Sequence, residues 1–257
     1  MIAPISLLTA LAFAAIYPLC FWISYDKPLK NNFHKFHIGL PNVIGGVVLV
    51  FIWFMDFPLS LKILVTLWKA IFISVSSYSW KKESPSPKLL LLPCLLGIYA
   101  FVSLQAHIIA PGWTTASIGI LSAMIFCCAF YAMNLGHWYL NVHGLPMFHL
   151  TRSIYVFWIL LGIRALWNAY YILFQTVMSR EDIISIFQFI IRMDGFLLII
   201  GIFFGTLFPL ITLYFVKEVL KLKNTQSATG ILYVILCAIL IGDIAYKYYL
   251  IKFGIPM

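Results

Sequence analysis

The chain has 257 residues and a formal net charge of +9, yet 63% of its residues are hydrophobic and only 10% are charged. Its mean hydropathy is +1.00. Soluble domains are about half apolar and about a quarter charged, so this composition excludes a water-soluble globular domain. Lipid must be the main solvent, and backbone hydrogen bonding in lipid requires either helices or a closed barrel.

Apolar runs of about 20 residues, rather than short alternating segments, favour helices over a barrel. The sequence therefore predicts an all-α, polytopic helical bundle that forms a single transmembrane domain over residues 1–257. Eight spans are expected, at residues 3–25, 38–55, 59–79, 89–110, 113–139, 151–174, 196–216 and 230–250.

The longest connection runs from Thr176 to Gly195 and has charged ends around an apolar middle. It is expected to form a short helix in the membrane interface, or an early extension of the seventh span. Inside the seventh span, Gly201 and Gly205 form a G-x-x-x-G pattern. This pattern predicts close packing against a neighbouring helix.

Lysine and arginine residues gather in alternate connections. The first, third, fifth and seventh loops carry three, three, one and three of them, with Arg152 at the start of the sixth span counted in the fifth loop, whereas the second, fourth and sixth carry none, none and two. The positive-inside rule then places both termini outside the cytoplasm, in an inner membrane of bacterial type. Because the cations form no basic face, nucleic acid is excluded as a partner. The expected partner is the lipid bilayer, and other membrane subunits are left open.

Histidines concentrate near the cytoplasmic ends of two predicted spans. His137 lies at the cytoplasmic end of the fifth span and His143 follows it, while His34 and His37 precede the second span and would share a helix face. His137 lies at the same expected depth as His37 and His34, so these residues are candidate axial ligands for a b-type haem, with His143 a further cofactor-binding candidate. The alternative is an ordinary interfacial helix end, rich in Trp and Tyr.

No metal ligands are assigned from the sequence. The five cysteines lie in apolar runs and lack the C-x-x-C spacing of many metal sites. The histidine-rich stretch also lacks the nearby Cys and carboxylate side chains that usually complete a zinc site.

Charged residues inside the spans are the second candidate site, because an ionisable group costs about 2.5–3.5 kcal/mol at the centre of a membrane helix. Arg164 and Asp243 each lie about 20 Å along their spans from the cytoplasmic end. Their matching depth predicts an ion pair. Lys69 is expected at a similar depth, and Lys247 lies one turn from Asp243. Such a cluster is net positive and suits a negatively charged ligand, although it could instead only fix helix packing.

Three classes of function are left open. Binding of haem b or quinone by a membrane subunit of an electron-transfer system leads by a small margin. The first alternative is a transporter or channel for a small anionic substrate, which a helix broken near Gly201, Gly205 or Pro209 would favour. The second is a membrane-embedded lipid-modifying enzyme with His143 or His137 as base. Catalytic residues stay unassigned, since no Walker A, G-x-S-x-G or H-E-x-x-H motif occurs.

Overall fold

A computed structural model of the chain describes residues 2–24, 29, 33–82, 86–109, 111–142, 145–179 and 182–257. In these ranges eight helical stretches are long and apolar enough to cross a membrane, which confirms the all-α, multi-pass class. The predicted ends at Tyr25 and Ala110 fall outside the described residues. The stretches are Ile2–Ser24, Phe33–Phe54, Leu59–Trp80, Pro87–Ile108, Trp113–Asn141, Phe148–Phe174, Met193–Lys221 and Thr225–Phe253.

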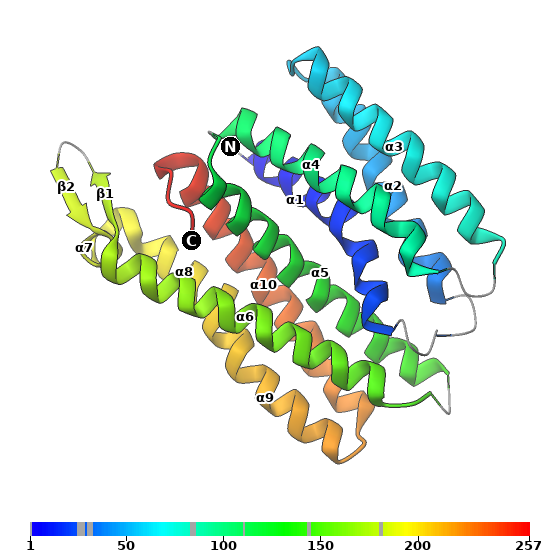
Figure 1. Cartoon of the computed structure of the whole chain (residues 1–257). Coiled ribbons are helices and arrows are strands. Elements are labelled where there is room, and N and C mark those ends of the chain that lie inside the picture. The colour runs from blue at the N-terminus through cyan, green and yellow to red at the C-terminus, as the bar shows by residue number, and fades with distance from the viewer. Residues whose placement is uncertain are drawn as a thin grey trace. The chain divides into compact units, whose positions relative to one another are not determined.

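The chain divides into two compact units, and the first covers Met1–Ala123. It holds α1 (Ile2–Ile16), the 3-10 helix Tyr17–Ser24, α2 (Phe33–Phe54), α3 (Leu59–Trp80), the 3-10 turn Pro87–Leu90, α4 (Leu91–Ile108) and the first part of α5 (Trp113–Asn141). Within this unit α1 contacts α2 and α4, and α3 contacts the same two helices (Figure 1). Trp68 is buried in this packing, and its indole N–H donates to the Pro93 carbonyl at 2.9 Å.

The second unit covers Met124–Met257. After the rest of α5 it holds α6 (Phe148–Phe174), β1 (Thr176–Ser179), β2 (Asp182–Ser185), α7 (Ile186–Ile191), the 3-10 turn Met193–Gly195, α8 (Phe196–Ile202), α9 (Phe208–Lys221) and α10 (Thr225–Phe253). Helix α10 contacts both α8 and α9, while α6 contacts α7 and α9. Helix α5 meets α6 where the Cys128 thiol lies 3.6 Å from the Ser153 carbonyl oxygen.

The seventh span is helical throughout, but it is not α-helical throughout. Between α8 and α9 the chain forms a π-helical turn, Phe203–Leu207, in which the Phe208 amide donates to the carbonyl of Phe203. Pro209 follows at once, has no N–H to donate, and its ring would crowd the carbonyl four residues earlier. The wider π turn accommodates the proline, and such turns occur frequently at functional sites.

Close packing of the seventh span, predicted from Gly201 and Gly205, is confirmed. A Cβ placed on Gly201 would lie 3.2 Å from the Ala245 Cβ on α10. A Cβ on Gly205 would lie 3.2 Å from the Cα of Gly242 and 2.7 Å from the Tyr246 ring. These two glycines therefore let α10 approach the π turn at backbone distance.

The connection from Thr176 to Gly195 differs in part from the prediction. Its second half contains a short helix, α7, as expected, but the first half is a β-hairpin in which Val177 pairs with Ile184. Those two side chains are buried, and their neighbours Met178 and Ile183 are exposed. This alternation with β-branched residues favours strands over a helix.

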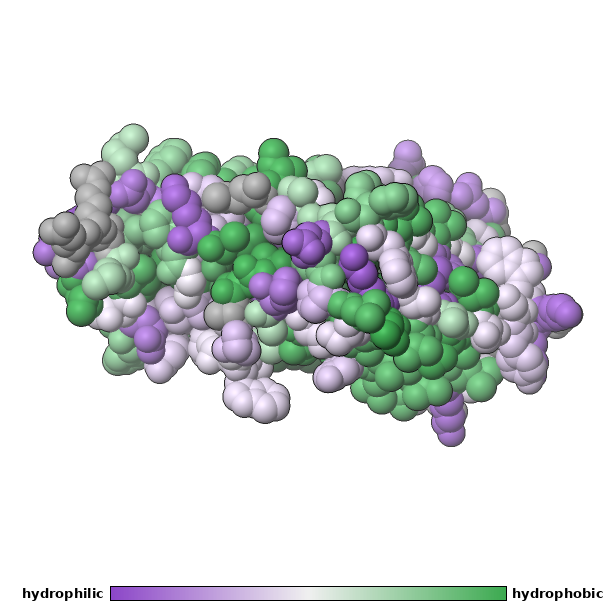
Figure 2. All heavy atoms as spheres, turned by 90° about the horizontal axis from the view of Figure 1, so that it is seen from above, coloured by the Kyte–Doolittle hydropathy of each residue, from purple (hydrophilic) through white to green (hydrophobic). Residues whose placement is uncertain are grey.

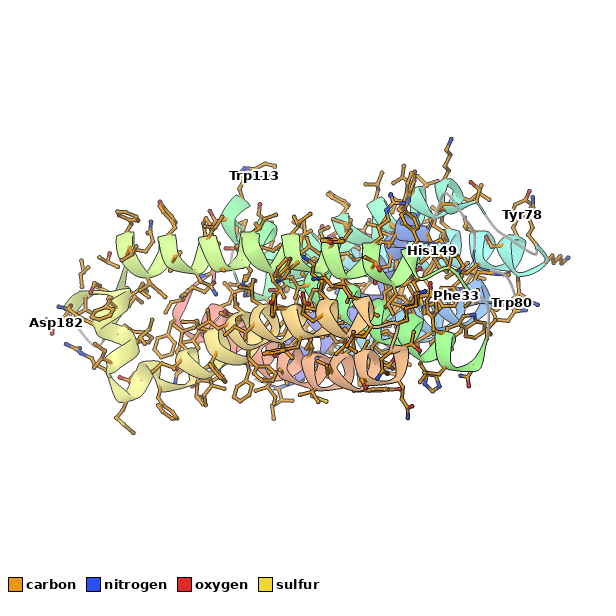
Figure 3. The ribbon with its side chains drawn as sticks, turned by 90° about the horizontal axis from the view of Figure 1, so that it is seen from below. Phe33, Tyr78, Trp80, Trp113, His149 and Asp182 are labelled. Atoms are coloured by element: carbon orange, nitrogen blue, oxygen red, sulfur yellow. The ribbon has the colours of Figure 1, made fainter. Side chains whose placement is uncertain are left out.

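The exposed surface suits a lipid environment. Figure 2 shows extended hydrophobic areas on the face that it presents. Trp113 at the start of α5 is 91% exposed and projects outward, and Tyr78 and Trp80 are exposed at the end of α3 (Figure 3). Tyrosine and tryptophan at span ends settle at the boundary between membrane and water.

Candidate functional site

Six polar side chains of the second unit gather where α6, the π turn and α10 meet. On α6, Arg164 and Asn168 are four residues apart and so share one helix face. Both are almost fully buried, at 1% and 3% exposure. We call this group the polar cluster, and its members are Arg164, Asn168, Thr206, Asp243, Tyr246 and Lys247.

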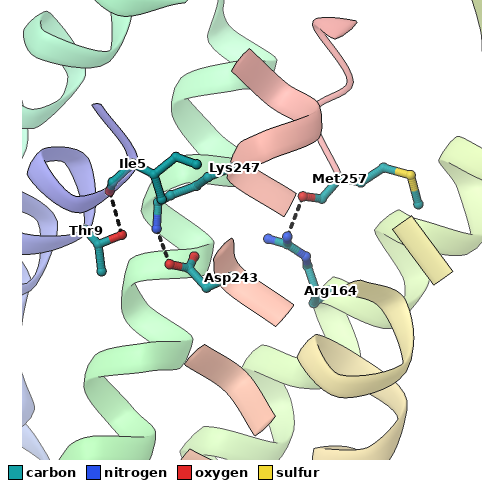
Figure 4. Close-up of polar contacts among 6 residues, drawn as sticks. All are labelled: Ile5, Thr9, Arg164, Asp243, Lys247 and Met257. Carbon is teal, nitrogen blue, oxygen red and sulfur yellow. Dashed lines mark hydrogen bonds and ion pairs between the residues drawn. The ribbon is translucent and has the colours of Figure 1, made fainter. Parts of the chain in front are cut away.

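The charged part of the cluster joins two cations and one carboxylate. The Lys247 ammonium forms an ion pair with Asp243 on the next turn of α10, and the two side chains are 9% and 5% exposed (Figure 4). The Arg164 guanidinium carbon lies 4.0 Å from the centre of the Tyr246 ring. Asp243 and Tyr246 are both close enough to Arg164 to interact with it electrostatically.

The neutral part is a triangle of hydrogen bonds. The Asn168 amide donates to the Thr206 hydroxyl at 3.1 Å and to the Tyr246 hydroxyl at 2.6 Å. The hydroxyls of Thr206 and Tyr246 lie 2.9 Å apart and share a further hydrogen bond. The triangle therefore connects the π turn to both α6 and α10. A change in the shape of the π turn would alter the contacts of Asn168 and Tyr246.

Thr206→Val is expected to lower the free energy of unfolding by about 1 kcal/mol, because hydrogen bonds between membrane helices contribute about 0.6–1.7 kcal/mol. Unfolding in mixed detergent micelles measures it. Thr212→Val is the matched control, since the Thr212 hydroxyl bonds the Phe208 carbonyl of its own helix. Equal effects of the two substitutions would contradict a special role for the triangle.

Residues 254–257 also reach the cluster. Gly254 has a φ of 66°, which ends α10 in the left-handed conformation that glycine adopts without strain. The chain then lies against α6, where the Trp167 indole donates to the Pro256 carbonyl at 2.7 Å. Arg164 donates to the main-chain oxygen of Met257 (Figure 4). The acceptor for Arg164 is a main-chain oxygen, so the backbone path of residues 254–257, which the Trp167 hydrogen bond holds against α6, positions the Arg164 side chain.

The sequence singled out four charged residues, and three of them lie in this cluster. Asp243 has its ion pair with Lys247, which sequence reasoning placed nearby without pairing them. A direct ion pair between Arg164 and Asp243 stays a prediction, supported by their electrostatic interaction. Lys69 belongs to the first unit, where its ammonium donates to the main-chain and side-chain oxygens of Asn42, so its membership of the cluster also stays a prediction.

The histidine candidates lie in both units. Helix α2 begins at Phe33, so His34 and His37 belong to the helix, and both are buried. The His37 ring is surrounded by the rings of Phe33, Phe36, Phe21 and Tyr17, whose centres are 4.0, 5.2, 6.0 and 5.6 Å away. Its Nδ1 also shares a hydrogen bond with the Tyr17 hydroxyl. This packing gives His37 a clear structural role.

His137 is exposed on α5 in the second unit, whereas His143 lies outside the described residues. The pairing of His137 with His37 or His34 as haem ligands therefore stays a prediction. In the part of the chain that the structure describes, no three His, Cys, Asp or Glu side chains come close enough together to hold a metal ion.

Sequence reasoning missed the neutral members of the cluster, although the signal was present for two of them. Asn168 follows Arg164 by four residues and Tyr246 follows Asp243 by three, which places each on the face of a charge already singled out. Thr206 had no such signal, because the π turn changes the helical phase after Phe203. Comparison of the chain with protein-family models, with curated proteins and with solved structures finds no match in any of the three.

Proposed function

We propose that the protein is a membrane transporter whose polar cluster binds a small anion during its passage. The observation that carries the proposal is the π turn Phe203–Leu207, which replaces the α-helical hydrogen bonding of the seventh span at the cluster itself. π turns inside α-helices occur frequently at functional sites, and helices with an irregular turn near the substrate are typical of transporters. Thr206 connects the π turn to Asn168 and Tyr246 through buried hydrogen bonds.

The charge of the cluster indicates the sign of the substrate. The cluster holds two basic side chains, Arg164 and Lys247, and one acidic side chain, Asp243. Arginine also offers several donors in a planar fork that suits oxyanions. A bound anion would bring the summed charge of these three side chains to zero, and its release would leave Arg164 with its contacts to Tyr246 and Met257.

Electron transfer has weaker support from the geometry. An axial haem ligand must present a ring nitrogen to the iron. His37 is enclosed by aromatic rings, and His137 belongs to the other unit. The transport proposal instead uses residues that contact one another within one unit, and it accounts for the buried charges that otherwise only cost stability.

Swelling of proteoliposomes in isotonic potassium salts, with valinomycin to carry potassium, tests anion transport. In at least one of chloride, nitrate, sulfate or phosphate, the wild type is expected to swell faster than protein-free vesicles. Arg164→Gln should lower that rate by about tenfold or more, because a hydrogen bond to a charged group contributes about 1.5–3 kcal/mol. Arg164→Lys should retain part of the rate, and Thr212→Val should leave it unchanged.

Two results would overturn the proposal. One is swelling of folded, reconstituted wild type at the protein-free rate in every salt. The other is a visible spectrum of the purified protein with dithionite-reduced b-type haem bands that disappear in His137→Ala. The second result would establish the electron-transfer alternative and would identify one axial ligand.

A further inference from the structure

A groove of about 140 Å³ lies on the second unit, away from the polar cluster, between the start of α6 and the end of α9. Two lysines, Lys217 and Lys221, line it together with Tyr155, Trp158 and Thr151. Its remaining lining is aliphatic. The groove thus combines cations and a hydroxyl with an apolar wall.

The first of these lysines, Lys217, is held by aromatic rings. Its ammonium lies 5.6 Å from the centre of the Tyr155 ring and 5.5 Å from that of Trp158. Among the described residues no carboxylate forms an ion pair with it. The Trp158 ring is itself fixed, since its indole N–H donates to the Leu210 carbonyl at 3.1 Å. A ring contact leaves the three N–H donors of the ammonium able to bind an anion.

The second lysine lies one turn further along α9. Lys221 pairs with Glu218 at 2.6 Å, but the two side chains are 61% and 40% exposed. An exposed pair of this kind contributes about 0–1 kcal/mol, so Lys221 can exchange its partner at little cost. Between Phe196 and Gly242, Glu218 is the one acidic residue in the sequence, against three lysines, which leaves this end of α9 basic.

We infer that the groove binds the phosphate of an anionic phospholipid, with Lys217 and Lys221 as its ligands and an acyl chain against the aliphatic wall. A groove of about 140 Å³ has room for a phosphate group. Basic pockets between transmembrane helices bind lipid headgroups in this way. The groove also lies where α6 begins and α9 ends, next to loops that the sequence predicts on the cytoplasmic side.

Competition for a fluorescent phosphatidylglycerol on the detergent-purified protein tests the inference. Unlabelled phosphatidylglycerol should displace the probe, whereas phosphatidylcholine should not. Lys217→Gln is expected to weaken binding about fivefold, which corresponds to about 1 kcal/mol for one lysine at a lipid surface. Lys217→Arg should retain most of the affinity. Lys217→Gln together with Lys221→Gln should weaken it further.

Lys62→Gln is the matched control, because the Lys62 ammonium also lies over a tryptophan ring, 5.8 Å from the centre of Trp53, but belongs to the first unit. It should bind the probe as the wild type does. Equal binding by Lys217→Gln and wild type would overturn the site, as would equal displacement by phosphatidylcholine. Displacement by inorganic phosphate at the same concentration as the lipid would assign the groove to a soluble phosphate instead. The anion-transport proposal is unaffected by any of these results, since it uses other residues.

Discussion

Asp243→Asn is expected to lower the free energy of unfolding by about 3–5 kcal/mol, the usual cost of removing one partner from a buried ion pair. Asp243 and Lys247 are both buried, so water cannot replace the lost carboxylate. If the predicted pairing of Arg164 with Asp243 holds, Arg164 would lose the same counter-charge. Denaturation in mixed micelles of mild detergent and dodecyl sulfate, followed by circular dichroism, measures the change.

The matched control is Glu218→Gln, which removes a carboxylate from an exposed lysine ion pair in the same unit. That change should stay within about 1 kcal/mol. Combining Asp243→Asn with Lys247→Met should recover part of the stability, since the second substitution removes the stranded cation. An unfolding midpoint of Asp243→Asn equal to that of wild type would contradict the assignment of Asp243 as a buried counter-charge.

A double-mutant cycle of Asp243→Asn with Arg164→Gln would test the predicted pairing of those two residues. Neighbours in one network show coupling energies of about 0.5–3 kcal/mol, while independent sites add within about 0.5 kcal/mol. Coupling in the higher range would establish that Arg164 and Asp243 form part of one charge network. Additive effects would leave Lys247 as the functional partner of Asp243.

Gly242→Ala is expected to be strongly destabilising. A Cβ at residue 242 would lie 2.2 Å from the Cα of Gly205 and 2.3 Å from its nitrogen. Both are backbone atoms, so α10 and the π turn would have to separate. Overpacking commonly costs about 1–3 kcal/mol, and a clash with backbone belongs at the upper end of that range. The same separation would lengthen the hydrogen bond between Thr206 and Tyr246.

Gly230→Ala on the same helix is the control, because a Cβ there would meet nothing within 4 Å. It should leave stability unchanged or raise it by up to about 1 kcal/mol, since alanine favours helix more than glycine. The comparison is made by unfolding midpoint and by transport rate in proteoliposomes. Equal midpoints for the two variants would show that α10 does not need backbone contact with the π turn.

Hydropathy along the chain was enough to assign the membrane class and the eight spans. Both follow from local composition, since a run of about 20 apolar residues partitions into lipid whatever its neighbours are. The same reasoning identified Arg164 and Asp243 as charges within the bundle, because a charge inside such a run cannot easily reach water. The close approach at Gly201 and Gly205 was also predictable, as their spacing places both on one helix face.

Which of these groups meet depends on tertiary packing. The rotation of each helix about its axis determines which of its side chains face a neighbouring helix. The mean hydropathy of a span depends little on that rotation. Thr206 joins Asn168 and Tyr246 because the π turn shifts the helical phase just before it, an effect of Pro209 and of packing against Gly242.

The hairpin and the groove depend on packing in the same way. Val177 and Ile184 become strand residues through pairing between two segments, and Lys217 meets Trp158 only because α9 packs on α6. The contact between Lys217 and Trp158 leaves no periodic signal in the chain, since it joins residues from separate helices. Local sequence sets which residues enter the membrane, and non-local packing sets which of them form a site.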